Sequence, residues 1–289
     1  MKYNCIFTGG SVRGLSYVGV LKAIEELGIE FDIRIGSSIG SLFLVFYSIG
    51  YSIDEIETEI NDLDLWKLFT DFNWNILNDV AISRGEKYLK WLRHKIESKY
   101  YKEAYQKGKM KPVCFKDIDK DIRIVATNLL NSELHIFSKE TTPDTEIALA
   151  MRASSAMPTL IPTVKYEDKI LIDGDISRGR PIWKLMPDLE ENENKILEFR
   201  MTGGKNNRFS KNPVALLNSI VNVAAYIIDN DATKTYCENK KFDIIQVDVP
   251  NTSFTDFALS NDKKKEIYKI GYDTVKNYFK TLEDNNERT

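Results

Sequence analysis

A serine at position 38 lies at the centre of the segment Gly36-Ser37-Ser38-Ile39-Gly40, which fits the pattern GxSxG. A nucleophilic serine between a strand and a helix occupies a turn so sharp that residues two positions away have no room for bulky side chains. Gly36 and Gly40 meet that demand. The pattern therefore predicts that Ser38 is the nucleophile of a serine hydrolase that acts on acyl esters.

The pattern also has an ordinary interpretation, a tight strand-to-helix turn with a buried serine. Because glycine and serine are common, GxSxG occurs by chance in roughly a tenth of chains of this length. The surroundings favour a nucleophile, since a strand-like run at 31–35 precedes the serine and an apolar, helix-like run at 39–49 follows it. The first turn of that helix would direct backbone amides at the site, where they favour developing negative charge.

A second turn, Gly9-Gly10-Ser11-Val12-Arg13-Gly14, also lies between a strand-like and a helix-like run. Its backbone amides could form an oxyanion hole, although a plain tight turn fits equally well. A phosphate-binding loop is disfavoured, because Gly14 is followed by Leu15-Ser16 instead of the Lys-Ser/Thr of a Walker loop, and the GxGxxG spacing also fails. In company with Ser38, the turn favours an oxyanion hole.

Most serine hydrolases use a histidine to accept the hydroxyl proton, and this chain has two, His94 and His135. His94 lies in a charged helical stretch, which is typical of a solvated surface residue. His135 alternates with apolar neighbours along a strand, which is typical of a half-exposed structural residue. In α/β-hydrolases the histidine follows the acid, and no histidine follows His135. A Ser-His-Asp triad is therefore not expected.

The remaining candidate base is a carboxylate. The apolar run Ile170-Leu171-Ile172 ends in Asp173-Gly174-Asp175, where parallel-sheet sites are built. An aspartate with an ordinary pKa of about 3.9 is a weak base, which burial or a second carboxylate such as Asp175 would strengthen. From the residues alone, Asp173-Gly174 is either the site of the base or only a tight turn.

The elements that must position these residues begin as strand, helix, strand, helix. This order predicts a parallel sheet whose ligand site lies at the carboxyl ends of its strands. The segment at about 52–115 differs, because it is rich in aromatic residues at helical spacing. We expect a single α/β domain over residues 1–289, with a central, mostly parallel sheet flanked by helices and a helical insertion. Strands are predicted at 2–8, 31–35, 122–127, 133–138, 170–173, 196–202 and 242–249, and helices at 14–27, 39–49, 145–153, 213–229 and 263–280.

Composition excludes several classes of protein. Forty basic and 43 acidic residues give a net charge of −3, so no excess of positive charge indicates nucleic-acid binding. The three cysteines, Cys5, Cys114 and Cys237, are scattered, which argues against a disulfide framework or zinc site and favours a reducing cytoplasm. A strand that begins at residue 2 leaves no room for a signal peptide. The longest apolar stretch, 11 residues at 39–49, is too short to span a bilayer.

Three motifs, in order, resemble those of the patatin-like phospholipase family. The turn at 9–14 resembles its GGG-x-[RK]-G loop, the segment 36–40 its GxSxG elbow, and Asp173-Gly174-Asp175 its DG[GA] motif. Weaker similarity covers Ala126-Thr127-Asn128, 151–158 and Arg180-Pro181-Ile182, so that the resemblance spans roughly residues 3–185.

The resemblance implies a Ser-Asp dyad without histidine, in which Ser38 is the nucleophile and Asp173 the base. It implies an oxyanion hole drawn from Gly9, Gly10, Ser11, Arg13 and Gly14, although the Arg13 side chain could equally be a structural ion-pair partner. No metal or other cofactor is expected, because the amides hold the oxyanion.

Two residues depart from the family pattern. Ser11 replaces the third glycine of the loop, and a serine there needs an allowed backbone angle. Asp175 replaces the glycine or alanine of the third motif and adds a negative charge close to the expected base. Neither departure removes the dyad.

The implied substrate is a lipid ester, with cleavage of the phospholipase A or lysophospholipase type. The aromatic residues Trp66, Phe69, Phe72 and Trp74 could cover the site or contact a membrane surface, and core packing of the insertion explains them as well. A cytoplasmic enzyme with peripheral membrane contact is therefore expected. Two alternatives stay open: a non-catalytic member that binds lipid or a partner protein, and an esterase or acyltransferase for small soluble substrates.

Overall fold

The computed structural model describes residues 1–64, 67–68, 81, 83–158, 160–177, 186–203, 241–252 and 256–286. Within them, eight strands form one sheet in the order β5-β6-β3-β2-β1-β7-β8, and β4 pairs with β3 beside this path. The neighbours from β3 through β8 in this order are parallel, whereas β4, β5 and β6 join by antiparallel pairing. The strands are β1 (Lys2–Phe7), β2 (Glu30–Ser37), β3 (Ile122–Asn128), β4 (Glu133–Phe137), β5 (Val164–Tyr166), β6 (Lys169–Asp173), β7 (Ile196–Thr202) and β8 (Phe242–Asp248).

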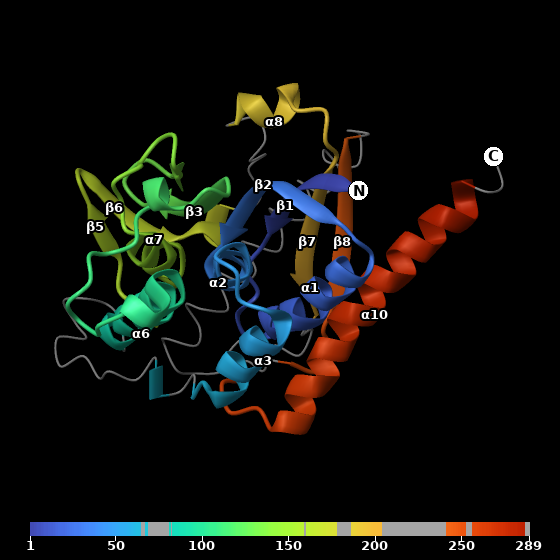
Figure 1. Cartoon of the computed structure of the whole chain (residues 1–289), viewed down its shortest axis with the longest axis horizontal. Helices are drawn as coiled ribbons and strands as arrows, with labels where there is room; N and C mark the ends of the chain where they lie inside the picture. The colour runs from blue at the N-terminus through green and yellow to red at the C-terminus, as the bar shows by residue number, and fades with distance from the viewer. Residues whose placement is uncertain are drawn as a thin grey trace.

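Helices cover both faces of the sheet (Figure 1). One face packs against α1 (Tyr17–Glu26), α2 (Ser38–Ser48), α7 (Ile147–Ser154) and α10 (Asn261–Asn286), whose apolar side chains join the strands in the larger core. The short helix α8 (Pro187–Glu191) covers the other face, where Met186 and Leu189 pack against strand residues. The central strands are thus buried on both faces, which explains why they appear in the sequence as nearly continuous apolar runs.

The remaining helices surround this layered core. Helices α3 (Ile53–Asp62) and α6 (Glu86–Tyr101) lie within the segment expected to be a helical insertion. Ile56 of α3 and Leu92 of α6 are buried in the same core as α1 and α7, so these two helices extend the main core. Four 3-10 helices complete the description: η1 (Ser11–Ser16), η2 (Lys102–Ala104), η3 (Phe115–Asp117) and η4 (Gly174–Ser177).

The expected fold class is confirmed. Every predicted strand is present with its ends within two residues of the prediction. The predicted helices in the described part of the chain are also present, although α1 begins three residues later than expected, directly after η1, and α10 is longer than expected. The structure adds β5, a strand of three residues that was not predicted. The predicted helix at 213–229 lies outside the described residues, as do the aromatic residues Trp66, Phe69, Phe72 and Trp74.

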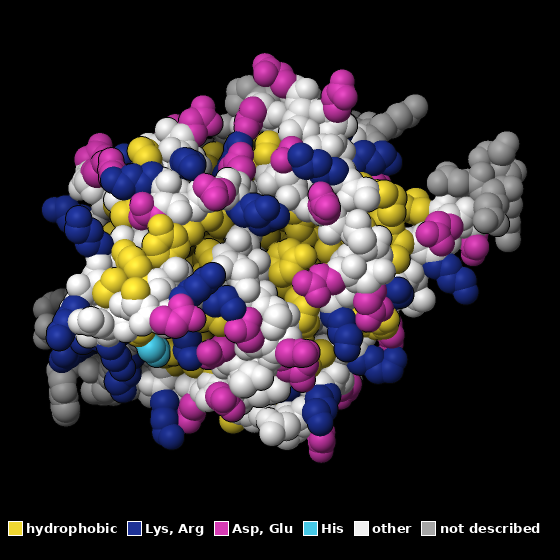
Figure 2. Space-filling view, viewed as in Figure 1, with side chains coloured by type: hydrophobic (Ala, Val, Ile, Leu, Met, Phe, Trp, Pro, Cys, Tyr) yellow, Lys and Arg dark blue, Asp and Glu magenta, His cyan; other side chains and the backbone are white. Residues whose placement is uncertain are grey.

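Basic and acidic side chains are interspersed over the face drawn in Figure 2. None of the helices in the described ranges combines the length and apolar character needed to cross a membrane.

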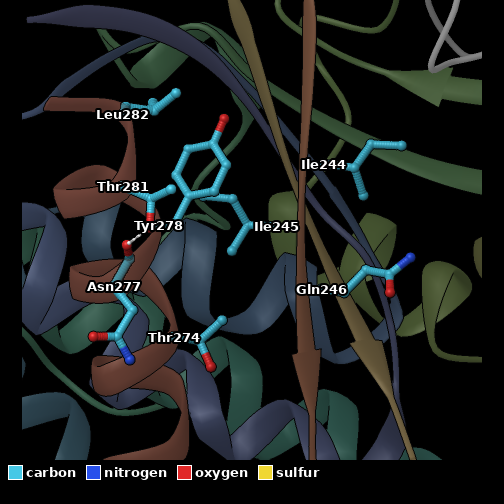
Figure 3. A pocket seen from close by; sticks show the side chains of 8 residues that line it. All are labelled: Ile244, Ile245, Gln246, Thr274, Asn277, Tyr278, Thr281 and Leu282. Atoms are coloured by element: carbon cyan, nitrogen blue, oxygen red, sulfur yellow. Dashed lines mark hydrogen bonds between the residues drawn. The ribbon is translucent and has the colours of Figure 1, made fainter. Parts of the chain in front are cut away.

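A groove of about 300 Å³ lies between β8 and α10 (Figure 3). Strand β8 is three positions away from β2 in the sheet, so this groove is separate from the strand end that carries Ser38. The lining side chains are Ile244, Ile245, Gln246, Thr274, Asn277, Tyr278, Thr281 and Leu282.

Candidate active site

Ser38 stands at the junction between β2 and α2, as the first residue of the helix. Its φ of 48° lies in the left-handed region, which is uncommon for a residue other than glycine and marks a sharp, strained turn. A Cβ at Gly40 would lie 2.2 Å from the carbonyl oxygen of Phe7, and a Cβ at Gly36 would lie 2.7 Å from Cα of Ser41. Backbone therefore fills the space on both sides, which is the steric reason for the two glycines of the pattern.

Ser38 and Asp173 meet because two strands end on the same edge of β3. Strand β2 runs parallel to β3 until Ser37 lies opposite Val125. Strand β6 approaches from the other direction, antiparallel to β3, and ends with Asp173 opposite Ala126. Since Val125 and Ala126 are adjacent, the carboxyl ends of β2 and β6 face each other. The Ser38 hydroxyl donates a hydrogen bond of 2.6 Å to Oδ2 of Asp173.

The carboxyl group of Asp173 lies in the interior, with no exposed surface, while Ser38 retains 9% of its surface. A buried carboxyl group is unfavourable unless hydrogen bonds replace its water. Oδ2 accepts from the Ser38 hydroxyl, and Oδ1 accepts from the backbone N–H of Asp175 at 2.9 Å. Both oxygens are therefore held, and the carboxyl group is oriented toward Ser38.

A second serine, Ser154 at the end of α7, forms hydrogen bonds with both the elbow and β3. The backbone N–H of Ser38 donates to Oγ of Ser154 at 2.8 Å, and the Ser154 hydroxyl donates to the carbonyl of Val125 at 2.6 Å. This side chain is fully buried. It connects the elbow to β3, and nothing in the residue pattern of 151–158 distinguishes it from its neighbours.

The glycine-rich turn packs directly against the elbow. Gly9 is so close to Ser38 that an added Cβ would lie 2.7 Å from Cβ of Ser38. Ser11 adopts a φ of 53°, so the serine that replaces a family glycine does occupy the left-handed region. The helix η1 begins at Ser11, so the backbone of Gly10 and Ser11 follows directly on the glycine that packs against Ser38.

The other members of the predicted oxyanion set have different surroundings. The N–H of Gly9 donates to Oδ1 of Asp175 at 2.8 Å. The Arg13 guanidinium donates to the carbonyls of Gly203 and Gly10, so this side chain braces the turn. Gly14 lies inside η1, where an added Cβ would lie 2.4 Å from Cγ2 of Ile39.

The family model described as patatin-like phospholipase matches residues 6–186, which contain the turn, the elbow and the Asp173 motif. The chain belongs to the patatin-like phospholipase family. The similarity at Arg180-Pro181-Ile182 lies inside the match but outside the described residues.

Relatives of this patatin-like chain include proteins from viruses and fungi. An uncharacterized protein of Acanthamoeba polyphaga mimivirus is 27% identical, over 94% of this chain and 92% of its own length. A probable lipid hydrolase of Invertebrate iridescent virus 6 is 27% identical over 61% of each chain. A lysophospholipase of Kluyveromyces lactis is 36% identical over 25% of this chain, which is 5% of that much longer protein.

Solved structures agree on the fold. VipD from Legionella pneumophila superposes with a TM-score of 0.67 at 15% sequence identity, covering 96% of this chain and 67% of that one. ExoU from Pseudomonas aeruginosa, in complex with SpcU, superposes with a TM-score of 0.55 at 16% identity, covering 96% and 52%. The patatin-like fold therefore extends across nearly the whole chain, well beyond the region matched by the family model.

Neither histidine lies beside Ser38. His94 Nδ1 is 2.9 Å from the hydroxyl of Tyr105 on the outer side of α6, and burial together with Lys95 lowers the pKa of His94. His135 lies opposite Ala126 on the other edge of β3, two strand spacings or about 10 Å from Asp173. Its ring packs against those of Phe137 and Tyr166, and burial lowers the pKa of His135.

Proposed function

We propose that this patatin-like chain is a serine hydrolase of lipid esters in which Ser38 is the nucleophile and Asp173 the general base. One observation carries the proposal: the Ser38 hydroxyl donates a 2.6 Å hydrogen bond to a buried carboxyl group at the strand ends. This distance lies within the range over which a general base can take the proton of a nucleophile. Among the described residues, neither His94, His135 nor Asp175 forms a hydrogen bond with the Ser38 hydroxyl.

In the proposed reaction, the Ser38 oxygen attacks the ester carbonyl carbon while its proton passes to Oδ2 of Asp173. The tetrahedral intermediate collapses, the C–O bond to the alcohol breaks, and the alcohol leaves with the proton from Asp173. Water then attacks the acyl-enzyme, again giving its proton to Asp173. The fatty acid departs, and the proton returns to Ser38.

Negative charge on the carbonyl oxygen of the intermediate requires donors that are already in place. The proposal assigns this task to the backbone N–H groups of Gly10 and Ser11, because the turn that carries them packs on the elbow. The first turn of α2 adds the positive end of a helix dipole beside Ser38. The Gly9 amide is already bonded to Asp175, and Arg13 to main-chain carbonyls, so we assign these two residues a structural role.

Labelling with a fluorophosphonate, beside hydrolysis of a p-nitrophenyl ester, tests the two roles. We expect Ser38→Ala to abolish labelling and hydrolysis. We expect Asp173→Asn to lower kcat by about 10²–10⁴-fold, the range for removal of a general base. His94→Ala and His135→Ala are the matched controls and should retain activity within about twofold. If His135→Ala abolishes activity while Asp173→Asn does not, the assignment of the base is wrong.

The substrate class is proposed as phospholipid or lysophospholipid esters, since relatives are named as a probable lipid hydrolase and as lysophospholipases. Esters with longer acyl chains, and substrate in aggregates, should then be cleaved faster than short soluble esters. A preference for short soluble esters would favour the esterase or acyltransferase alternative. A chain that fails to react with the fluorophosphonate would favour the lipid-binding alternative. A cytoplasmic location and contact with a membrane surface stay predictions from the sequence.

A further inference from the structure

Asp175 replaces a small residue of the family motif and lies between the three parts of the candidate site. It is the second residue of η4, two positions after Asp173, and its side chain is partly buried. Oδ1 of Asp175 accepts a hydrogen bond of 2.8 Å from the N–H of Gly9 and a second, very short one from the hydroxyl of Ser37. Its own N–H donates to Oδ1 of Asp173. One residue thus contacts the glycine-rich turn, the elbow and the expected base.

These contacts hold the turn in place against the nucleophile. Gly9 leaves no room for a side chain, because an added Cβ would lie 2.5 Å from Oδ2 of Asp175 and 2.7 Å from Cβ of Ser38. A hydrogen bond from a backbone N–H keeps its donor within about 2.7–3.2 Å of the acceptor oxygen, whether that acceptor is charged or neutral. The Asp175 carboxylate therefore fixes the turn at its first glycine, immediately before the amides of Gly10 and Ser11.

We propose that Asp175 is a positioning residue whose carboxylate fastens the glycine-rich turn to the serine elbow and so sets the distance between the oxyanion donors and Ser38. This role rests on the proposed function of Ser38 and Asp173. A glycine or alanine at position 175, as in the family motif, has no side-chain acceptor for the Gly9 amide. In this chain the turn is held by a side chain in addition to its own packing.

Two substitutions of Asp175 separate hydrogen bonding from charge. The hydrogen bonds from Gly9 and from Ser37 both end on Oδ1. Asp175→Asn therefore keeps an acceptor oxygen for these two donors and loses the charge, whereas Asp175→Ala loses both of these bonds. We expect Asp175→Ala to lower kcat on a soluble p-nitrophenyl ester by about 10–100-fold, since small misplacement of reacting groups has effects of this order. KM should change by less than about threefold. Asp175→Asn should recover most of the lost kcat.

Control variants make the result decisive. Asp168→Ala removes an exposed carboxylate in the β5–β6 turn and should leave kcat unchanged. Ser37→Ala deletes one of the two donors and should lower kcat by about 3–10-fold, which tests the proposal even if Asp175→Ala does not fold. Wild-type kcat in the Asp175→Ala or Ser37→Ala protein overturns the proposal. So does an Asp175→Asn protein as slow as Asp175→Ala, because charge would then be the cause. Hydrolysis that survives Ser38→Ala contradicts the proposed function itself.

Discussion

At the scale of single residues, the candidate site is a hydrogen-bond network that joins the elbow, the Asp173-Gly174-Asp175 segment, α7 and β3. One oxygen of the Asp173 carboxyl group accepts a hydrogen bond from the Ser38 hydroxyl, and the other accepts one from the backbone N–H of Asp175. The backbone N–H of Ser38 donates a hydrogen bond to the Ser154 hydroxyl, which in turn donates one to the carbonyl of Val125. In such networks the loss of one member leaves the remaining groups unpaired, and an unpaired buried group costs more than the bond itself contributes.

Ser154→Ala tests this argument. The substitution would leave the buried N–H of Ser38 and the carbonyl of Val125 without these partners, so the free energy of unfolding should fall by about 1–3 kcal/mol. Because the elbow would lose its support, kcat/KM should also fall, by about tenfold. Urea unfolding and ester hydrolysis measure the two effects. Ser98→Ala, at a partly buried serine on α6, is the matched control and should change neither quantity appreciably.

A second prediction concerns His135 and pH. Burial lowers the pKa of His135 below its ordinary value of 6.5. The unfolded chain therefore binds a proton at His135 at a higher pH than the folded chain does. The stability that neutral His135 contributes is fully present above about pH 6.5 and is lost as the pH falls toward the folded-state pKa. In His135→Phe, the free energy of unfolding should decrease less between pH 7.5 and pH 5 than in the wild type.

The measurement for His135→Phe is urea unfolding at both pH values, with hydrolysis at pH 8 as a check on the site. Phenylalanine keeps the ring packing against Phe137 and Tyr166, and hydrolysis should be unaffected. An identical pH dependence of the free energy of unfolding in variant and wild type would show that the pKa of His135 is the same in the folded and unfolded chain, which contradicts the prediction.

The residues of the site differ in how far sequence could predict them. Ser38 and the turn at 9–14 are predictable, because glycines beside a strand end leave a local signature. The residues around Asp173 fit a catalytic base and a tight turn equally well. Its position beside Ser38 depends on the pairing of β6 with β3. Ser154 left no signature, since its contact with Ser38 depends on where α7 packs on β3 and not on spacing in the chain.

At the scale of elements, the site depends on an arrangement in which two strands share one edge of a third. Strand β3 pairs with parallel β2 along its first half and with antiparallel β6 along its second half. The two strand ends meet where the pairing changes, which places Ser38 and the Asp173 carboxyl group opposite each other. Hydrophobic patterns predicted these three strands but not their pairing, because the pattern of one strand does not show which distant strand becomes its neighbour. The three-residue β5 was too short to leave a pattern.

Gly40→Ala tests the close packing of α2 against the end of β1. An added Cβ would lie 2.2 Å from the Phe7 carbonyl oxygen and 2.6 Å from that of Thr8, so the helix or the strand end must move. We expect a loss of about 3 kcal/mol, the upper end of the range for overpacking, and loss of hydrolysis because Thr8 leads into the turn. Gly28→Ala is the control, as its φ is 61° but no atom lies within 4 Å of its added Cβ. It should cost about 1–2 kcal/mol and retain activity. Equal losses of activity in the two variants would contradict the steric argument.

At the scale of the whole molecule, the fold extends beyond the region matched by the family model. That match ends at residue 186, yet β7 and β8 continue the sheet next to β1, and α10 packs along α1 and β8. Figure 1 shows α10 running along this side of the molecule, with its last turns beyond the core. Helix η1 begins within the glycine-rich turn and leads into α1. Because α10 packs against both η1 and α1, it also supports the site. Similarity to relatives and to solved structures covers over 90% of the chain. We predict that the chain, α10 included, unfolds as one cooperative unit.

Truncation tests whether α10 is part of that unit. Four of its apolar side chains are buried, Ile267, Tyr268, Val275 and Phe279. At about 1.5–3 kcal/mol each, their burial contributes about 6–12 kcal/mol, comparable with the total stability of about 5–15 kcal/mol of an ordinary domain. A chain that ends at residue 260 should therefore fail to unfold cooperatively on heating and should lack hydrolysis. A chain that ends at residue 283 loses only polar residues after the last buried side chain, and it should melt within a few degrees of the wild type by circular dichroism. If the chain of 260 residues melts cooperatively at the wild-type temperature, α10 is not part of the cooperative unit. If that chain also hydrolyses esters, the packing of α10 against η1 and α1 is not needed for the site.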